Sequence, residues 1–396
     1  MIPRASQVAL AEQALSLLRE HAIAYLACEE RTGKTLAAIL TAEKADITNV
    51  LVLTKKKALE GWFDTLKQFE HDKIYYVTNY HQACNVQFKP DLVILDEAHN
   101  YISGYPKRSV MWNEVKRLTA GKPLLFVSAT PHAQGYQQLY HQFALSDWSP
   151  WASYKRFYDW FKVYGIPYSL KINGEDIPQY DRTNPVCYDE VKHLFITSTR
   201  ASLGFEHEPE DVLHYVTLSD YAKDIYNKLV DKKKRIAELE GYGKLICDTS
   251  SKLRVSLHML EGGCAKIDDT YIVLPNTEKV DYIKQTFGDT TDMVIMYQYI
   301  AEGQKLRASF KNALILQGTS FAEGVDLHEY KHLIIYSQDF STARHTQRRA
   351  RQANLNRLEP IKVHYILVKG GISSNVYKSV SLNKKNFVDT VFEVIK

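Results

Sequence analysis

The sequence predicts an α/β protein with two doubly wound parallel-sheet domains and an aromatic, helical connecting segment between them. Three observations support this fold. Short, nearly continuous apolar runs recur in both halves of the 396-residue chain, helical patterns separate them, and polar motifs directly follow several of the runs. Buried parallel strands have this character because helices cover both faces of their sheet. Ligands of such sheets gather at the carboxyl ends of the strands.

The composition fits a globular protein of two domains. Hydrophobic residues make up 45% of the chain and charged residues 24%, which are ordinary values. No apolar run reaches the roughly 18–20 residues that span a bilayer, and residues 1–19 lack a signal-type apolar block. Five scattered cysteines without a CxxC pair argue against a disulfide framework or a zinc site. We therefore expect a cytoplasmic protein that has no membrane partner.

Residues 1–145 are predicted to form the first domain. Helices are expected at Thr35–Lys44 and Lys57–Phe69. The strands are expected at Ile23–Ala27, Val50–Thr54, Leu92–Leu95 and Leu124–Val127.

The first of these strands leads into CEERTGKT at residues 28–35 and then into a helix. Backbone N–H groups and the helix dipole bind phosphates at such a junction. Lys34 is expected to neutralise the β- and γ-phosphates, and Thr35 to place its hydroxyl on Mg²⁺. Cys28 and Arg31 stand where glycines are usual, which is a departure from the common pattern.

Two adjacent acids, Asp96 and Glu97, end the strand at Leu92–Leu95. Neighbouring side chains on a strand project to opposite sides, so Asp96 can hold Mg²⁺ while Glu97 orients or deprotonates water. A solvated Asp-Glu turn is the alternative, but the preceding Val-Ile-Leu run and the spacing from Lys34 disfavour it. Ser128-Ala129-Thr130 follows the next apolar run and is predicted to be a coupling loop.

With these motifs in order, the chain resembles the superfamily 2 DNA helicases and translocases. It is most similar to their Swi/Snf-like branch, in the compact DEAD/DEAH-box form that bacteriophages encode. Gly33-Lys34-Thr35 resembles motif I, Asp96-Glu97-Ala98-His99 motif II and Ser128-Ala129-Thr130 motif III. The resemblance implies two RecA-like domains, ATP with Mg²⁺, and a DNA partner, single- or double-stranded. It also places Arg31, Thr32 and Gly33 in the nucleotide-binding loop.

Other parts of the first domain extend the resemblance. Gln7, preceded by Arg4, is similar to the adenine-reading glutamine of these proteins. Lys55 and Lys56 lie in a region that resembles motif Ia. Asn79 and Tyr80 resemble a short loop that contacts the DNA backbone.

Residues 206–396 are predicted to form the second domain, with an N-terminal helical region that includes a helix over Ser219–Glu240. Within that range, the Lys232–Arg235 run is interpreted as a solvated face rather than a set of phosphate contacts. The second domain has no phosphate loop of its own, so the nucleotide is expected to bind between the two domains. Its strands are expected at Tyr271–Leu274, Met293–Tyr297, Leu314–Leu316, Leu333–Tyr336 and Val363–Val368.

Gln317-Gly318-Thr319-Ser320, continuing to Gly324-Val325-Asp326, resembles motif V. The resemblance implies that Gly324 and Asp326 contribute to the nucleotide site, and that Gln317, Gly318 and Thr319 contact nucleic acid.

The segment from Arg344 to Gln352 resembles motif VI, although Arg344 and Gln347 stand where glutamine and glycine are expected. Arg348 and Arg351 fall on its two arginine positions, which implies that both contact ATP and take part in catalysis, and Arg351 is the first candidate for an arginine finger. Arg349 is the alternative finger. Arg344, Arg349 and Arg357 are otherwise interpreted as surface residues or nucleic-acid backbone contacts.

Residues 146–205 are predicted to be the connector. Their aromatic residues, between Trp148 and Tyr164, fall on two helical faces. We favour an interdomain core over stacking on nucleic-acid bases for these rings. Residues 165–185 are rich in turn formers and are expected to be irregular.

The leading hypothesis is a monomeric, ATP-dependent DNA helicase or translocase, with replication or recombination proteins as further partners. One alternative is a nucleic-acid-binding regulatory protein with a degenerate ATPase core, suggested by Cys28, Arg31 and Arg344. Another is the ATP-driven motor subunit of a recombination or restriction complex.

Overall fold

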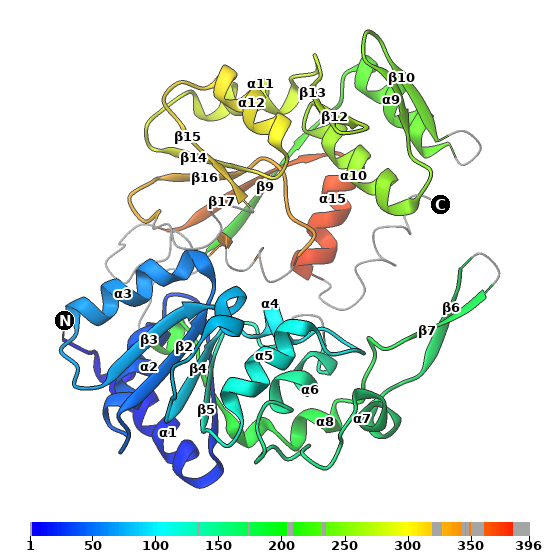
Figure 1. Cartoon of the computed structure of the whole chain (residues 1–396). Helices are drawn as coiled ribbons and strands as arrows, with labels where there is room; N and C mark the ends of the chain where they lie inside the picture. Colours follow the sequence, from blue (N-terminus) through cyan, green and yellow to red (C-terminus); the bar gives the residue numbers. More distant parts are fainter. Residues whose placement is uncertain are drawn as a thin grey trace. The chain divides into compact units, whose positions relative to one another are not determined.

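The computed structural model describes residues 2–132, 135–172, 175–203, 209–231, 235–318, 327–341, 345, 348–349 and 360–382. The chain divides into two compact units, Met1–Phe205 (unit 1) and Glu206–Lys396 (unit 2) (Figure 1). Each unit contains a parallel sheet with helices packed on it. The predicted fold class is confirmed.

Unit 1 is built on a parallel sheet with the strand order β3-β2-β4-β5-β1-β8. Its strands are β1 (Ile23–Cys28), β2 (Asn49–Thr54), β3 (Ile74–Asn79), β4 (Leu92–Asp96), β5 (Leu124–Val127) and β8 (Phe195–Ser198). Its helices are α1 (Ala5–His21), α2 (Lys34–Glu43), α3 (Leu59–Gln68), α4 (His99–Ile102), α5 (Val110–Thr119), α6 (Gln137–Phe143), α7 (Phe157–Tyr164) and α8 (Val186–Asp189).

Alternate residues of each central strand face two different hydrophobic cores. On β4, Leu92 and Ile94 pack with α1, α2 and α3, whereas Val93 and Leu95 pack with α5, α6 and α7. Burial on both faces explains why these strands are continuous apolar runs. Because the strands are parallel, their carboxyl ends lie at one edge of the sheet, where the motifs lie.

Most aromatic residues between positions 148 and 164 belong to the core of unit 1, although Trp148 and Tyr158 are exposed. Trp151, Phe157 and Trp160 are almost fully buried beside α6, and the rings of Trp151 and Trp160 lie 5.2 Å apart. The prediction of an interdomain core is therefore wrong. These rings pack with α5 and α6 in the core on one face of the first sheet.

Residues 165–185 were expected to be irregular, and this prediction is also wrong. They contain an antiparallel hairpin of β6 (Tyr168–Ile172) and β7 (Glu175–Gln179), which extends from α7 in Figure 1. Leu170 and Ile177 are opposite each other in the hairpin, and both are exposed.

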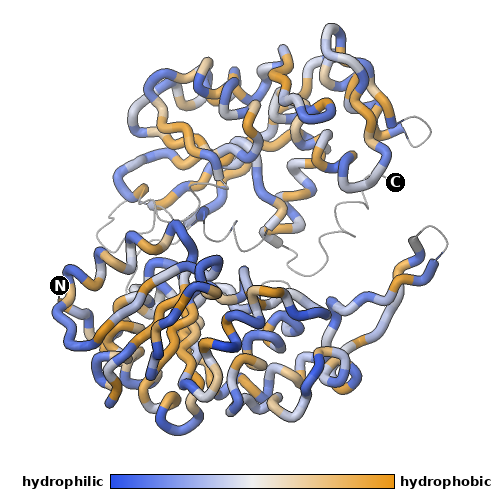
Figure 2. The backbone as a smooth tube through the Cα atoms, in the orientation of Figure 1, coloured by the Kyte–Doolittle hydropathy of each residue, from blue (hydrophilic) through white to orange (hydrophobic). Residues whose placement is uncertain are grey.

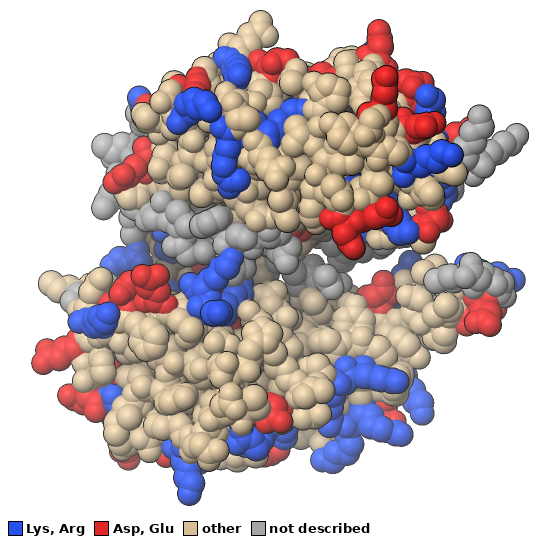
Figure 3. Space-filling view, turned by 45° about the horizontal axis from the view of Figure 1, so that its top comes forward, with Lys and Arg blue, Asp and Glu red and all other residues tan. Residues whose placement is uncertain are grey.

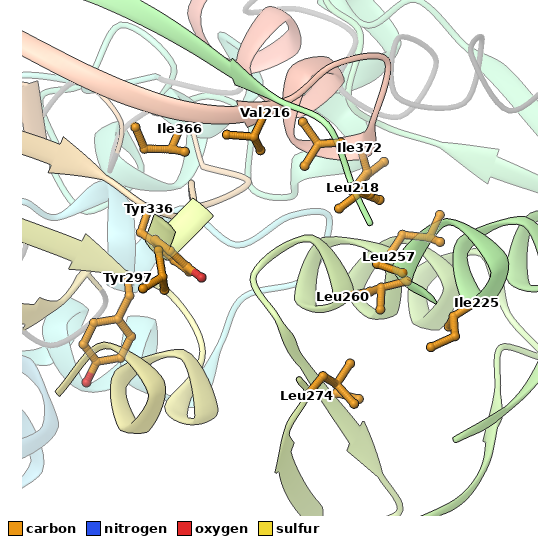
Figure 4. Close-up of a cluster of buried hydrophobic side chains, with 14 of the residues drawn as sticks. Val216, Leu218, Ile225, Leu257, Leu260, Leu274, Tyr297, Tyr336, Ile366 and Ile372 are labelled. Carbon is orange, nitrogen blue, oxygen red and sulfur yellow. The ribbon is translucent and has the colours of Figure 1, made fainter. Parts of the chain in front are cut away.

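Unit 2 is built on a parallel sheet with the order β15-β14-β16-β17-β9. Its strands are β9 (Glu210–Val216), β14 (Met293–Tyr297), β15 (Leu314–Gln317), β16 (His332–Ile335) and β17 (Lys362–Val368). The helices are α9 (Asp220–Val230), α10 (Ser250–Glu261), α11 (Glu278–Phe287), α12 (Ile300–Ser309) and α15 (Ile372–Tyr377). Figure 4 shows side chains from β9 and β17, such as Val216 and Ile366, in the same core as Leu257 and Leu260 of α10.

Two predictions about unit 2 are corrected. The helix expected over Ser219–Glu240 ends at Val230, and residues Ile236–Leu239 form β10, which pairs with β11 (Gly243–Ile246). Ala237 and Leu239 are buried while Ile236 is exposed, which is the alternation of a strand. Residues 271–274 lie in and directly after β13 (Thr270–Val273), which pairs antiparallel with β12 (Cys264–Ile267) outside the main sheet. Residues 232–234 lie outside the described part of the chain.

Hydrophobic residues concentrate in the sheets, and many charged side chains lie on the surface (Figure 2 and Figure 3). Hydrophobic residues concentrate along the strands of both units in Figure 2. Acidic and basic side chains are mixed over the face shown in Figure 3. Within the described ranges, no helix has both the length and the apolar character needed to cross a membrane.

Candidate functional site

The junction between β1 and α2 has the geometry of an anion-binding loop. Gly33 adopts φ +86° just before α2, and a Cβ there would lie 2.2 Å from Gln7 Nε2. Only glycine satisfies both conditions without displacement. No described side chain caps this helix start, so the N–H groups of its first turn are available to a ligand. Arg31 adopts φ +69°, an uncommon conformation for a residue other than glycine.

Lys34 folds back onto this loop. Its Nζ donates to the carbonyl oxygens of Cys28 (2.7 Å) and Glu29 (3.0 Å). Thr32 Oγ1 donates to the same Glu29 carbonyl at 2.7 Å. The ammonium group is therefore held at the loop, and Thr35 lies half-buried in the first turn of α2.

The start of α1 lies against the loop. Gln7 is 5% exposed, and its Nε2 donates to the Gly33 carbonyl at 3.3 Å. Its Oε1 accepts from the Arg4 N–H at 2.9 Å, and Arg4 Nη2 donates to the Thr32 carbonyl at 3.4 Å. The structure thus brings Arg4 and Gln7 to the predicted nucleotide loop.

Asp96 lies at the end of β4 with one carboxylate oxygen already hydrogen-bonded. Asp96 Oδ2 accepts from Thr54 Oγ1 at 2.6 Å and from Trp62 Nε1 at 3.0 Å. Burial, followed by the charge of Glu97, raises the pKa of Asp96 to about 6. A nearby cation would favour the ionised form of this carboxyl group.

Glu97 is linked to the predicted coupling loop and adopts φ +50°. Its Oε2 accepts from Ser128 Oγ at 2.8 Å and lies 3.4 Å from His99 Nδ1. The Thr130 N–H donates to Ser128 Oγ at 3.1 Å. Hydrogen bonds therefore connect the acid to the segment Ser128-Ala129-Thr130.

The charge environment keeps Glu97 ionised. Burial acts to raise the pKa of Glu97, but the positive charges of Lys55, His99 and Lys34 outweigh burial, so the pKa is lowered. A buried carboxylate that stays ionised can accept a proton from water.

The residues predicted to contact DNA in unit 1 occupy different environments. Lys55 is only 7% exposed. Its charge contributes to the lowered pKa of Glu97 and opposes the rise in the pKa of Asp96, which stays raised. Tyr80 is 1% exposed, and its hydroxyl donates to the Asp96 carbonyl at 3.1 Å. Lys56 is exposed, and Asn79 Oδ1 accepts from the His81 N–H at 3.1 Å. Lys55 and Tyr80 are thus placed beside the acids rather than on the surface.

In unit 2, the structure brings together residues of the segments that resemble motifs V and VI. Arg348 is 2% exposed, its Nη2 donates to Gln298 Oε1 at 3.0 Å, and it lies 3.7 Å from Asp339. A Cβ at Gly318 would lie 2.2 Å from Arg348 Nη2. Gln317 Nε2 donates to the Gln298 carbonyl at 3.3 Å.

Arg349, the alternative finger, is bound within unit 2. Its Nε donates to Asp211 Oδ1 and its Nη2 to the Pro209 carbonyl, both at 2.7 Å. Other residues of the predicted site lie outside the described part of the chain, namely Thr319, Ser320, Gly324, Asp326, Arg344, Gln347, Arg351 and Arg357.

Three residues contact the site in unit 1 in ways that the sequence did not predict: Thr54, Trp62 and Arg200. Thr54 ends a predicted strand, so its position at the sheet edge was a usable signal. Trp62 and Arg200 had no local signal, because they reach the site only through tertiary contacts with Asp96 and with Glu29 and Glu30.

Comparisons with known proteins add two structural similarities. No protein-family model matches the chain, and no curated protein matches it. A Sulfolobus solfataricus SWI2/SNF2 ATPase core in complex with double-stranded DNA is 12% identical, with 98% of this chain and 92% of that chain covered and a TM-score of 0.44. The SWI2/SNF2 ATPase core domain of the same organism is 12% identical, with 98% and 90% covered and a TM-score of 0.42. Function is therefore inferred from the residues of the chain itself.

Proposed function

We propose that this protein is an ATPase that couples ATP hydrolysis to movement on DNA, as a helicase or translocase. The observation that carries the proposal is the grouping of Lys34, Asp96-Glu97 and Ser128 at the ends of strands in one parallel sheet. The motif order supports assignment to superfamily 2, in its Swi/Snf-like branch and its compact phage-type DEAH-box form. We propose a monomer in the cytoplasm.

The proposed nucleotide site lies in unit 1. The loop around Gly33, with the open start of α2 and Lys34, fits the phosphates of ATP. Gln7 and Arg4 lie next to this loop and are proposed to bind the adenine side, with Arg31 and Thr32 as part of the loop. Glu97 is the proposed base for the attacking water.

Asp96 and Thr35 are the proposed Mg²⁺ ligands. A divalent cation would compensate the buried carboxyl group whose pKa is raised, and carboxylate and hydroxyl oxygens suit Mg²⁺. When bound, the ion would neutralise charge that develops on the phosphates.

The second domain is proposed to supply an arginine finger. Arg351 remains the first candidate, with Gly324 and Asp326 as further nucleotide-site residues. Arg348 is already bonded to Gln298 and close to Asp339, so we propose that it links the segments resembling motifs V and VI. For DNA contacts we propose Lys56, Asn79, Gln317, Gly318 and Thr319, whose affinity would fall with salt if they bind phosphates.

The direct test measures steady-state ATP turnover with and without single- and double-stranded DNA. DNA is expected to stimulate turnover, and Lys34→Ala to abolish it. Lys44→Ala is the matched control, since Lys44 follows α2 at its other end and its Nζ pairs with Glu12 at 2.7 Å. If no nucleic acid stimulates turnover, the motor proposal is wrong, and if Lys34→Ala turns over ATP normally, the site is wrong.

A regulatory protein with a degenerate ATPase core is the second candidate. The observation that favours it is Arg31 at positive φ in a position where glycine is usual. Measurable turnover that disappears in Glu97→Gln would reject it. Activity that requires a nuclease or recombinase partner would instead favour a motor subunit of a larger complex.

A further inference from the structure

The loop before Gly33 contains two acids, Glu29 and Glu30, where a triphosphate is proposed to bind. The Glu29 side chain is 41% exposed and the Glu30 side chain 15%. Both carboxylate oxygens of Glu30 are buried, and no described residue donates a hydrogen bond to them. Uncompensated, these charges would oppose the binding of a polyanion.

Arg200 lies directly against both acids. It follows β8, is 7% exposed, and donates its backbone N–H to Glu29 Oε2 at 2.7 Å. Its guanidinium Nη1 lies 3.6 Å from Glu30 Oε2, and its Nη2 lies 4.0 Å from Glu29 Oε2. The guanidinium charge therefore compensates the buried Glu30 carboxylate.

Backbone bonds fix the turn that contains Arg200 beside the loop. The Glu29 N–H donates to the Ser198 carbonyl at 2.9 Å, which continues the pairing of β1 with β8. Thr199 and Ser202 close the turn, because each backbone N–H donates to the other's hydroxyl, at 3.2 Å and 3.1 Å. Arg200 is thus held on the sheet and does not have to be ordered when a ligand binds.

We infer that Arg200 is a positioning residue of the nucleotide site: it neutralises Glu30 and holds Glu29, so that the loop accepts a polyphosphate. This inference rests on the proposed function. The charge effect predicts graded losses when Arg200 is removed, largest for ATP, smaller for ADP and smallest for AMP, because fewer ligand charges then face the uncompensated acids.

The experiment compares Arg200→Gln, Arg200→Lys, Glu30→Gln and the double variant Arg200→Gln/Glu30→Gln. Nucleotide affinities are measured by calorimetry, together with kcat, KM and the midpoint of thermal unfolding. Arg200→Gln is expected to weaken ATP binding by about tenfold or more and to raise KM more than it changes kcat. The double variant is expected to restore affinity, and Arg200→Lys to retain part of it.

Arg117→Gln is the matched control in the same unit. Arg117 Nη2 donates to the Ala83 carbonyl at 2.9 Å, and the substitution is expected to leave nucleotide affinity unchanged. Unchanged ATP affinity in Arg200→Gln, equal losses for ATP and AMP, or a loss that Glu30→Gln does not restore would each overturn the inference.

Two further outcomes separate this inference from the proposed function. If Arg200→Gln does not fold, Glu30→Gln alone still tests the inference: it is expected to bind ATP at least as tightly as the unmodified chain, and weaker binding would overturn it. If the unmodified chain binds no nucleotide, the proposed function itself has failed. If the unmodified chain binds ATP and all the variants bind it with the same affinity, only the role of Arg200 has failed.

Discussion

Both units lead a buried parallel strand into the start of a helix, but the two helix starts differ. In unit 1, β1 leads to α2, whose first turn follows Gly33 and has no cap from a described side chain. In unit 2, β14 leads to α12, where Glu302 Oε2 accepts from the backbone N–H groups of Tyr299 (2.9 Å) and Gln298 (3.0 Å). Ser337 Oγ donates to the same oxygen.

The difference shows that a parallel sheet by itself does not make an anion site. In unit 2 the chain's own buried carboxylate caps the two residues just before the helix, whereas in unit 1 the start of α2 has no such cap from a described side chain and is where we propose that an external anion binds. A strand that leads into a helix therefore has a folding role at its helix start in unit 2 and a proposed catalytic role in unit 1.

The largest expected effect separates the two acids Glu97 and Glu302. Glu97→Gln is expected to lower ATP turnover by about 10²–10⁴-fold, because an amide cannot accept the proton of water, while nucleotide binding is retained. Single-turnover hydrolysis and calorimetry measure the two properties. Glu302→Gln is the control and is expected to keep turnover per folded molecule. An equal loss of ATP turnover in Glu97→Gln and Glu302→Gln would contradict the different roles assigned to these two acids.

The second prediction concerns the filled helix start. Glu302→Ala removes the acceptor for Tyr299, Gln298 and Ser337, and is expected to destabilise unit 2 by about 3 kcal/mol. Denaturant unfolding, followed by a probe in unit 2, measures this loss. Nucleotide affinity should not change, and a loss below about 1 kcal/mol would show that the capping carboxylate is dispensable.

The third prediction tests whether the buried Asp96 carboxylate lowers the stability of the folded protein. The pKa of Asp96 is raised from 3.8 to about 6, so the folded chain binds this proton more tightly than the unfolded chain. Stability is therefore lost as pH rises from about 4 to about 6, and the loss is complete above that range. Asp96→Asn is expected to stabilise the protein by about 2–3 kcal/mol at pH 8.

This gain should disappear as pH falls toward 4, and Mg²⁺ should reduce it at pH 8 if the ion binds the Asp96 carboxylate. Denaturant unfolding at both pH values, with and without Mg²⁺, provides the measurement. A gain of equal size at pH 4 and pH 8 would mean that the charge of Asp96 is not its cause.

The smallest expected effect is a pH response of unit 2. Burial, with the charges of His214 and His332, lowers the pKa of His364 from 6.5 to about 4. The contribution of neutral His364 to the free energy of unfolding is fully present above pH 6.5. It is lost as pH falls from 6.5 through 4, because His364 binds a proton more tightly in the unfolded chain than in the folded one. His364→Phe is expected to flatten this dependence by about 1–2 kcal/mol after allowance for solvent screening.

Thermal unfolding between pH 4 and pH 7 measures the response. His193→Phe is the matched control, because His193 is exposed in unit 1. An unchanged slope in His364→Phe would assign the acid sensitivity to another group.

The fold was predictable where strands are buried on both faces. Leu92–Leu95 and Leu124–Val127 are continuous apolar runs because each strand contacts two cores. Strand β3 lies at a sheet edge, with Ile74 57% and Tyr76 42% exposed, so it gives no such run. The hairpin β6–β7 had a signal that was overlooked, since the sequence Asn173-Gly174 between its strands is typical of a tight hairpin turn.

The site was predictable to the extent that its residues follow strands. Lys34, Asp96, Glu97 and Ser128 come together because parallel strands share one carboxyl edge. Arg200 is separated from Glu29 by 171 residues, and no local pattern connects them. Residues such as Arg200 contact a motif from a distant part of the chain. Their positions depend on tertiary packing, which the periodicity and spacing of the sequence do not specify.

The hydrogen bonds from Arg4 and Gln7 to the loop have a practical consequence for handling the protein. A purification tag or fusion partner joined at residue 1 would emerge only a few residues from the loop that contains Thr32 and Gly33, the proposed nucleotide loop. Proteolytic trimming that removed Gln7 would remove its hydrogen bond to the Gly33 carbonyl and so alter the proposed nucleotide loop. Preparations that look homogeneous by size could therefore differ in activity, and mass spectrometry of the amino-terminal peptide would reveal the reason.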